Sequence, residues 1–298
     1  MTSTSYVSHA YPRRFLVPAV LVFSVFFMAP AALGLYLSLT NASTLSARSD
    51  FIGFKNFELL FGNNGAAFLG SIGTQFIYAI TLTVAKSIVG VGLALLLDRV
   101  FVGRTALRAI VYMPMMFSTI VVGITFYFLL SQDGLFNEAL RWVGLGFLTQ
   151  DWFGSFDLAL CTAAAVETWI GIGWTVVIVL AALQGVPQEL VEAAKIDGAN
   201  AAQTTFLIKL PLVSHAIALT SLLSFIGGMK AFEIIYATTG GGPGTSTQVM
   251  TIFIAKAFGT TNLGYAAAAQ FVQFALITIL AVGIQLLASK ITKRRMGN

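Results

Sequence analysis

The sequence predicts an all-helical integral membrane protein with six transmembrane helices, and three observations support this fold class. Hydrophobic residues make up 57% of the 298 residues and charged residues only 10%, whereas about 25% of the residues of a soluble domain are charged. Six apolar runs are each long enough to cross a bilayer, which takes about 20 residues. Basic residues are concentrated in alternate loops between these runs.

The six runs define one membrane domain, residues 15–288, between a short tail at residues 1–14 and a basic tail at residues 289–298. Backbone polar groups in lipid must pair within the protein, so runs of this length are expected to be helices. No internal repeat and no linker points to a second domain. The predicted spans are residues 15–39, 68–97, 109–130, 158–183, 212–237 and 265–288.

The first span contains Pro18 and Pro30. Proline is tolerated in a membrane helix where local irregularity or a neighbouring helix pairs the carbonyl groups that it frees. We therefore expect an irregular but unbroken first span.

Basic residues set the predicted orientation, because cytoplasmic loops carry an excess of Lys and Arg. With the N-terminus in the cytoplasm, the inner segments hold eleven basic residues: Arg13, Arg14, Arg99, Arg104, Arg108, Lys195, Lys209, Lys290, Lys293, Arg294 and Arg295. The outer segments then hold four: Arg48, Lys55, Arg141 and Lys256. Both termini are predicted to be cytoplasmic, and so is the polar loop at residues 186–211.

Several classes of function are disfavoured by the same residues. The basic residues are spread over short loops rather than gathered on one face, which argues against nucleic acid as a partner. Cys161 is the only cysteine and lies in a hydrophobic run, so a disulfide framework and a Cys-based metal site are both excluded. We predict no catalytic residue and no metal site in this chain.

Two spans contain charged residues that need a protein or water environment. Lys86 lies in the second span and Glu167 in the fourth, and an intramembrane charge costs at least about 2.5 kcal/mol on insertion scales. Their depths allow a contact between the two, in a stretched or water-bridged form, but do not decide whether they interact. Trp169 and Trp174 flank two glycines in the same span as Glu167. We predict that these four residues line a solute path, with ordinary helix packing as the alternative.

The loop at residues 186–211 is a polar interruption between two apolar spans. Apolar Leu190 and Ala194 alternate with charged Glu192 and Lys195, which is typical of a short surface helix. Gly198 suits the end of such a helix because glycine adopts the left-handed conformation at little cost. On spacing alone, an ordinary interhelical loop remains the simpler interpretation.

The end of the fifth span carries a second group of polar residues. Lys230 and Glu233 are three residues apart, which predicts a pair on one helix face. The glycines before Pro243 do not form a phosphate-binding loop, because no Lys-Ser or Lys-Thr follows them. A flexible outer turn is one interpretation of this segment.

Several motifs resemble those of the permeases of binding-protein-dependent ABC importers. Glu192-Ala193-Ala194, then Asp197-Gly198-Ala199 and Pro211, is similar to the EAA loop of that family. The run from Lys230 to Gly241-Gly242-Pro243 is similar to another family segment. The wider match is to the carbohydrate branch, which includes the maltose and glycerol-phosphate permeases, and to the first of its two permease subunits.

The resemblance implies a type I ABC importer permease fold and a transport subunit rather than an enzyme. Its EAA loop would form the helix that docks on a cytoplasmic ATPase, and Gly241, Gly242 and Pro243 would lie near the receptor protein. The implied partners are a second homologous permease, two ATPase subunits, an extracytoplasmic binding protein, a sugar and the lipid bilayer. This chain would hold no cofactor, since ATP and Mg would bind to the ATPase, and it would lie in a bacterial or archaeal plasma membrane.

Three alternatives stay open. Glycerol-phosphate or a polyol could replace the sugar as the solute. An ion-coupled secondary transporter could use Lys86, Glu167 and Glu233 as an ion relay, although no inverted repeat is evident. A membrane scaffold could use the exposed cytoplasmic helix only to recruit a partner.

Overall fold

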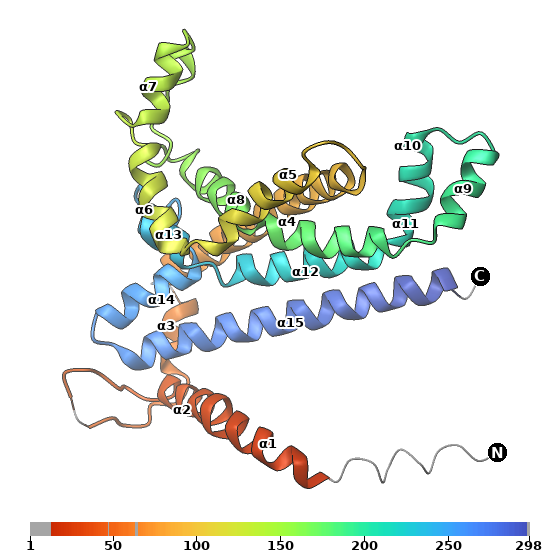
Figure 1. The fold of residues 1–298 in the computed structure, drawn as a ribbon. Coiled ribbons are helices and arrows are strands. Elements are labelled where there is room, and N and C mark those ends of the chain that lie inside the picture. The colour runs from red at the N-terminus through yellow and green to blue at the C-terminus, as the bar shows by residue number, and fades with distance from the viewer. Residues whose placement is uncertain (1–12, 47, 63–64, 297–298) are drawn as a thin grey trace, which may run out of the picture. The chain divides into compact units, whose positions relative to one another are not determined.

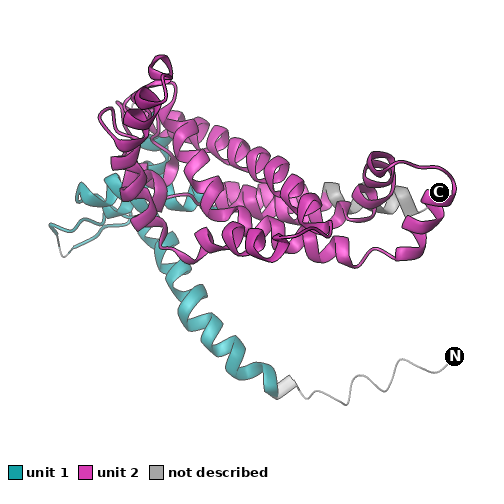
Figure 2. Cartoon of the chain, turned by 45° about the horizontal axis from the view of Figure 1, so that its top comes forward, with its two compact units in different colours: residues 1–66, 254–274 teal, residues 67–253, 275–298 magenta. Residues whose placement is uncertain are grey.

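A computed structural model describes residues 13–46, 48–62 and 65–296. The chain divides into two compact units, residues 1–66 with 254–274 and residues 67–253 with 275–298, which Figure 2 distinguishes by colour. No strand forms in the described ranges, in agreement with the predicted all-helical class. Residues 1–12 of the predicted N-terminal tail and residues 297–298 of the basic tail lie outside the described residues.

Unit 1 begins with a helical run from Val17 to Ser38, which matches the predicted first span. A π-helical turn, Ser24–Met28, interrupts it just before Pro30. Proline cannot donate a hydrogen bond to the preceding turn, and the wider π turn accommodates it. Its elements are η1 (Arg13–Leu16), α1 (Val17–Phe23), η2 (Ser24–Met28), α2 (Ala29–Ser38), α3 (Lys55–Phe61), the end of α14 (Met250–Gly259) and the start of α15 (Leu263–Met296).

Asn56 of α3 holds the end of α2 in unit 1. Its Nδ2 donates to the backbone oxygens of Ser38 and Thr40, both at 2.8 Å. Close packing also requires glycine at residue 264, because a Cβ atom there would lie 2.1 Å from the Thr40 oxygen. The buried polar groups at the end of α2 are therefore paired within the unit.

Unit 2 contains the long helices α4 and α8 and the shorter α12, which contact one another (Figure 1). Its elements are α4 (Ala66–Asp98), α5 (Arg104–Tyr112), η3 (Met113–Met116), α6 (Thr119–Leu129), α7 (Leu135–Trp142), η4 (Gly146–Leu148), α8 (Ala159–Gln184), α9 (Gln188–Ile196), α10 (Ala201–Gln203), η5 (Thr204–Lys209), α11 (Leu210–Leu212), α12 (Ser214–Met229) and α13 (Glu233–Thr238). The start of α14 and the end of α15 complete it.

Close helix packing in unit 2 depends on small residues. A Cβ atom on Gly90 of α4 would lie 2.6 Å from Cγ2 of Thr175 in α8. One on Gly228 of α12 would lie 2.7 Å from Cα of Ala79 in α4. Small residues at such contacts are the common way for membrane helices to approach closely.

Two predicted spans are not continuous helices, and the structure corrects both. The third, residues 109–130, is broken after η3, where Phe117 and Ser118 are extended and α6 turns by 100°. Pro114 lies in this break and lacks the amide hydrogen that a continuous helix needs. Four single helices of the described chain are long and apolar enough to span a membrane, and six spans result when each bent pair counts as one.

The fifth predicted span, residues 212–237, is interrupted twice. The helix axis bends by 66° at Val213, between α11 and α12. At the other end α12 stops at Met229, and α13 begins only at Glu233. The ten-residue helix α14 was not predicted, because its apolar run is too short to suggest a span.

Candidate solute path and coupling site

The polar side chains of the candidate site lie on the buried face of α4. Buried residues follow one another along this helix at spacings that are mostly three or four, as expected for one helix face: Phe68, Ser71, Gln75, Tyr78, Ala79, Leu82, Lys86, Gly90, Ala94 and Leu97. Lys86 therefore faces protein, which is where an intramembrane charge is expected.

Glu167 of α8 is held by two side chains of α4. The hydroxyl of Tyr78 donates to Glu167 Oε2 at 2.6 Å, and Lys86 Nζ lies 3.8 Å from Glu167 Oε1. Only 11% of the Lys86 side chain and 17% of the Glu167 side chain are exposed. Because 3.8 Å exceeds hydrogen-bond length, the ion pair is a stretched one, and the contact that the sequence left open is present.

The ammonium group of Lys86 lies against the backbone of α8. A Cβ atom at Gly171 would be 2.6 Å from Lys86 Nζ and 2.9 Å from its Cε, so only glycine leaves this space free. Glu167 is the partner that the structure gives Lys86, and the 3.8 Å between them is longer than an ordinary hydrogen bond. An ammonium group has three N–H donors, so Lys86 can also bind a further acceptor in the adjoining space.

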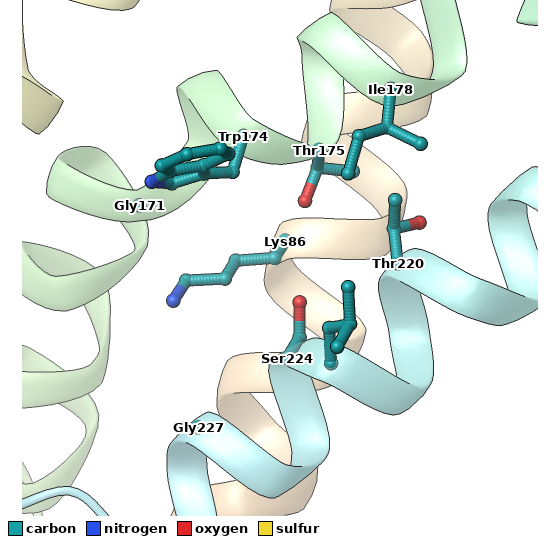
Figure 3. A pocket seen from close by; sticks show the side chains of 9 residues that line it. Lys86, Gly171, Trp174, Thr175, Ile178, Thr220, Ser224 and Gly227 are labelled. Atoms are coloured by element: carbon teal, nitrogen blue, oxygen red, sulfur yellow. The ribbon is translucent and has the colours of Figure 1, made fainter. Parts of the chain in front are cut away.

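One cavity beside Lys86 is named here the Trp174 cavity. It measures about 250 Å³. In Figure 3 the Lys86 side chain extends between α8, which carries Gly171 and Trp174, and α12, which carries Ser224 and Gly227. Its lining residues are Lys86, Gly171, Trp174, Thr175, Ile178, Thr220, Leu223, Ser224 and Gly227. An indole face together with hydroxyl groups and an ammonium group can stack on and hydrogen-bond a polyhydroxylated solute.

A second cavity, named here the Glu233 cavity, is also lined by Lys86. It measures about 380 Å³ and is lined by Lys86, Thr119, Glu167, Ile170, Gly171, Gly227, Lys230, Ala231, Phe232, Glu233 and Ile234. Three of the four predicted path residues, Lys86, Glu167 and Trp174, thus line one or both cavities. Trp169 lines neither and packs on Phe126, with ring centroids 5.3 Å apart.

The predicted pairing of Lys230 with Glu233 is wrong. Lys230 ends α12 and Glu233 starts α13, so the two residues do not share a helix face. Neither residue forms an ion pair within the described chain. Both instead contribute charge to the wall of the Glu233 cavity.

The polar loop folds into the predicted surface helix, α9. Ala194 is its buried residue, whereas Glu192, Ala193 and Asp197 are exposed. Gly198 ends the helix with φ of 85°, as its position predicted. The amide of Gly198 donates to Lys195 O, and the amide of Ala199 donates to Ala194 O, which is the paired arrangement that commonly closes a helix with glycine.

The next turn of the loop is capped as well. Asn200 accepts from the amide of Gln203, and Gln203 Oε1 accepts from the amide of Asn200. This reciprocal capping starts α10, after which the chain continues through η5 to Pro211 in α11. Ala199 and Pro211 therefore lie at the two ends of the return path from α9 to the membrane helix α12.

An ion pair that sequence reasoning missed ties this return path to α4. Lys209 Nζ lies 2.6 Å from Asp98 Oδ2, and both side chains are largely buried. A cavity of about 540 Å³ adjoins the pair, and its wall includes Arg99 and Phe206. Because 111 residues separate the two partners in the sequence, no local spacing rule could have found them.

Gly241, Gly242 and Pro243 form an ordered turn. Thr247 donates to the Gly242 oxygen at 2.7 Å and lies 2.7 Å from the hydroxyl of Thr239. The turn lines a cavity of about 280 Å³ with Tyr127 and Phe153, among others. The glycine-rich segment is thus a hydrogen-bonded structure rather than an open flexible turn.

Membrane-length helices, charged open cavities between them and an exposed polar helix outside them are the features of a multi-pass membrane permease. The family described as "Binding-protein-dependent transport system inner membrane component" matches residues 86–293. The chain belongs to this family and is a transport subunit of ABC importers, an inner-membrane protein rather than an enzyme.

Relatives of similar length support this assignment. The chain is 30% identical to the multiple sugar-binding transport system permease protein of Streptococcus mutans, over 97% of this chain and 99% of that protein. It is 31% identical to the sulfoquinovosyl glycerol transport system permease protein of Agrobacterium fabrum, over 92% and 89%. It is 28% identical to the trehalose/maltose transport system permease protein of Thermococcus litoralis, over 88% of each chain.

A solved structure confirms the fold. A chain in the crystal structure of a bacterial ABC transporter involved in the import of the acidic polysaccharide alginate superposes with a TM-score of 0.82. The match covers 94% of this chain and 95% of that chain at 23% identity. The predicted ABC importer permease fold is therefore correct.

Proposed function

We propose that this chain is a permease subunit that imports a sugar, from mono- to oligosaccharide, delivered by an extracytoplasmic binding protein. The observation that carries the proposal is the pair of open cavities that Lys86 and Glu167 line, between helices of membrane length. The names of the relatives from Streptococcus mutans and Thermococcus litoralis support a sugar as the solute.

The solute would use the groups that the two cavities present. The exposed face of Trp174 offers a stacking surface, and stacking on aromatic rings suits the apolar face of a sugar. The N–H donors of Lys86 would bind solute oxygens, as would the hydroxyl groups of Ser224 and Thr220. Glu167, anchored by Tyr78, would accept hydrogen bonds from solute hydroxyl groups on the Glu233 side.

Energy would come from partner subunits. In this proposal α9 docks on a cytoplasmic ATPase, where exposed Glu192 and Asp197 orient the contact and the small Ala193 permits close approach. ATP and Mg bind to two such ATPases, and a second homologous permease encloses the path with this chain. ATP binding then favours the outward-open state of the path over the inward-open state. This shift arises because ATP binds to the importer more tightly in one state than in the other.

Purification with native partners and reconstitution test the proposal. The tagged chain, extracted in mild detergent, should bring with it a second permease and an ATPase. Liposomes containing that complex should take up radiolabelled sugars only with ATP and the binding protein, and a panel of sugars, polyols and glycerol-phosphate identifies the solute class. Uptake by this chain alone, driven by an ion gradient without ATP, would contradict the proposal.

A further inference from the structure

Lys86 stands at the junction of two separate cavities. The Trp174 cavity and the Glu233 cavity share three lining residues, Lys86, Gly171 and Gly227. Two of the three are glycines, so Lys86 contributes the only side chain that the cavities have in common. The Lys86 side chain is therefore the candidate for a wall between them.

The position of this wall is set by its neighbours. Glu167 draws the ammonium group toward α8 at 3.8 Å, and Tyr78 fixes Glu167 in turn. The absence of a side chain at Gly171 lets the Lys86 side chain lie flat against α8. At Gly227 a Cβ atom would meet nothing within 4 Å, so the opposite side of the passage is open.

The sizes of the cavities favour a movable wall. Binding sites commonly measure about 300–1,000 Å³; the Trp174 cavity, at about 250 Å³, is below this range, and the Glu233 cavity, at about 380 Å³, is near its lower end. Joined, they would fall well inside that range. A lysine side chain has four rotatable carbons, and the ammonium group of Lys86 lies 3.8 Å from Glu167, so the side chain can move when another acceptor replaces that partner.

We propose that Lys86 is the gating residue of the solute path: its side chain closes the passage between the Trp174 cavity and the Glu233 cavity. Glu167 holds the gate shut, and a solute opens it by presenting oxygen atoms that replace Glu167 as partners of the ammonium group. This inference rests on the proposed function, because it assumes that the two cavities belong to the transport path.

Cysteine accessibility tests the gate in the assembled importer. In a Cys161→Ala background, which removes the only native thiol, Thr119→Cys reports on the Glu233 cavity and Ser224→Cys on the Trp174 cavity. A membrane-impermeant, positively charged methanethiosulfonate is added to right-side-out or inside-out membrane vesicles without ATP. With Lys86 present, each reporter should react from one side of the membrane only, and from opposite sides.

Shortening the gate should abolish this separation. With Lys86→Ala, the reagent from either side should reach both reporters at comparable rates, whereas Lys86→Met, which keeps most of the length of the side chain but loses the charge that Glu167 holds, should retain part of the one-sided pattern. Glu167→Gln leaves Lys86 in place but removes its charged partner, and it should give intermediate access. This second variant tests the gate if Lys86→Ala does not assemble.

Two results would overturn the inference in distinguishable ways. If both reporters react from one side while Lys86 is present, the passage is open and Lys86 is not the gate, although the path remains. If neither reporter reacts from either side, with or without Lys86, these cavities are not part of a water-filled path, and the proposed site fails together with the gate.

Discussion

The hydroxyl of Tyr78 donates a hydrogen bond of 2.6 Å to Glu167 Oε2, joining α4 to α8 within the membrane domain. Tyr78 has no exposed surface, so water cannot replace this donor when it is lost. Glu167 therefore depends on Tyr78 for its position, and Lys86 depends on Glu167.

Tyr78→Phe should destabilise the protein and weaken transport together. A hydrogen bond to a charged group contributes about 1.5–3 kcal/mol, so we expect a lower midpoint of thermal unfolding in detergent. Tyr127→Phe is the matched control, since Tyr127 is 43% exposed and donates no hydrogen bond within the described chain. Equal effects of the two substitutions would show that the Tyr78 hydroxyl has no special role.

Gly171→Ala should impair uptake more than it impairs folding. The added methyl group would lie 2.6 Å from Lys86 Nζ, and the flexible end of the lysine would move aside and away from Glu167. Gly73→Ala is the control, because its methyl group meets nothing within 4 Å and Gly73 is not among the residues that line the two cavities. We expect similar unfolding midpoints for both variants and a much lower uptake rate for Gly171→Ala; unchanged uptake would count against the Lys86–Glu167 pair.

Gly90→Ala should loosen the contact between α4 and α8. The new Cβ atom would lie 2.6 Å from Thr175 Cγ2, and overpacking of this kind costs about 1–3 kcal/mol. Gly92→Ala, two residues away on α4, meets nothing within 4 Å and should not lower stability. Thermal unfolding of the two variants in the same detergent measures the difference, and a Gly90→Ala protein as stable as Gly92→Ala would refute the close contact.

Removal of the Lys209–Asp98 pair should reduce the coupling of ATP hydrolysis to uptake. Lys209→Met leaves a largely buried carboxylate without its partner, at a cost of about 1.5–3 kcal/mol. A double variant that exchanges the charges, Asp98→Lys with Lys209→Asp, should restore part of the coupling. Arg99→Met is the control and should have little effect, because it breaks no ion pair within the described residues. The ratio of solute imported to ATP hydrolysed is the measurement; an exchange variant no better than Lys209→Met would argue against the pair.

Gly198→Val should uncouple the importer while the spans remain inserted. A β-branched residue at φ of 85° is strained by about 1–3 kcal/mol, so the turn after α9 would open. Gly198→Asn tolerates the left-handed conformation better and should keep more activity. ATP-dependent uptake and the membrane content of the protein are compared, and normal uptake by Gly198→Val would contradict a role for this turn in coupling.

The sequence predicted several features whose signal is local. Four of the six spans follow from apolar length, and the end of α9 follows from a single glycine at residue 198. A partner for Lys86 was expected because charges inside a membrane need partners, but the sequence left open whether Glu167 is that partner. The local spacing of Lys230 and Glu233 gave a wrong prediction, because the helix breaks between them.

Features that depend on tertiary geometry could not be predicted in this way. The 100° bend before α6 combines Pro114 with two extended residues, and hydropathy averages over such a break. Tyr78 resembles any aromatic residue of an apolar span, although its spacing of eight residues from Lys86, about two helical turns, could have placed both on one face. The sequence did not distinguish Trp169 from Trp174. In the structure Trp169 packs on Phe126, whereas Trp174 lines a cavity.

The capped corner between α9 and α10 has a mechanical consequence. Two backbone hydrogen bonds close α9, and two further bonds lock Asn200 to Gln203, so the corner has few free torsions. A flexible turn would deform when α9 is displaced, whereas a hydrogen-bonded turn of this kind would transmit the displacement of α9 to α10. The Lys209–Asp98 ion pair would transmit the displacement of α9 to α4, the helix that also carries Lys86. Helix α4 would therefore link the movement of α9 to the two cavities.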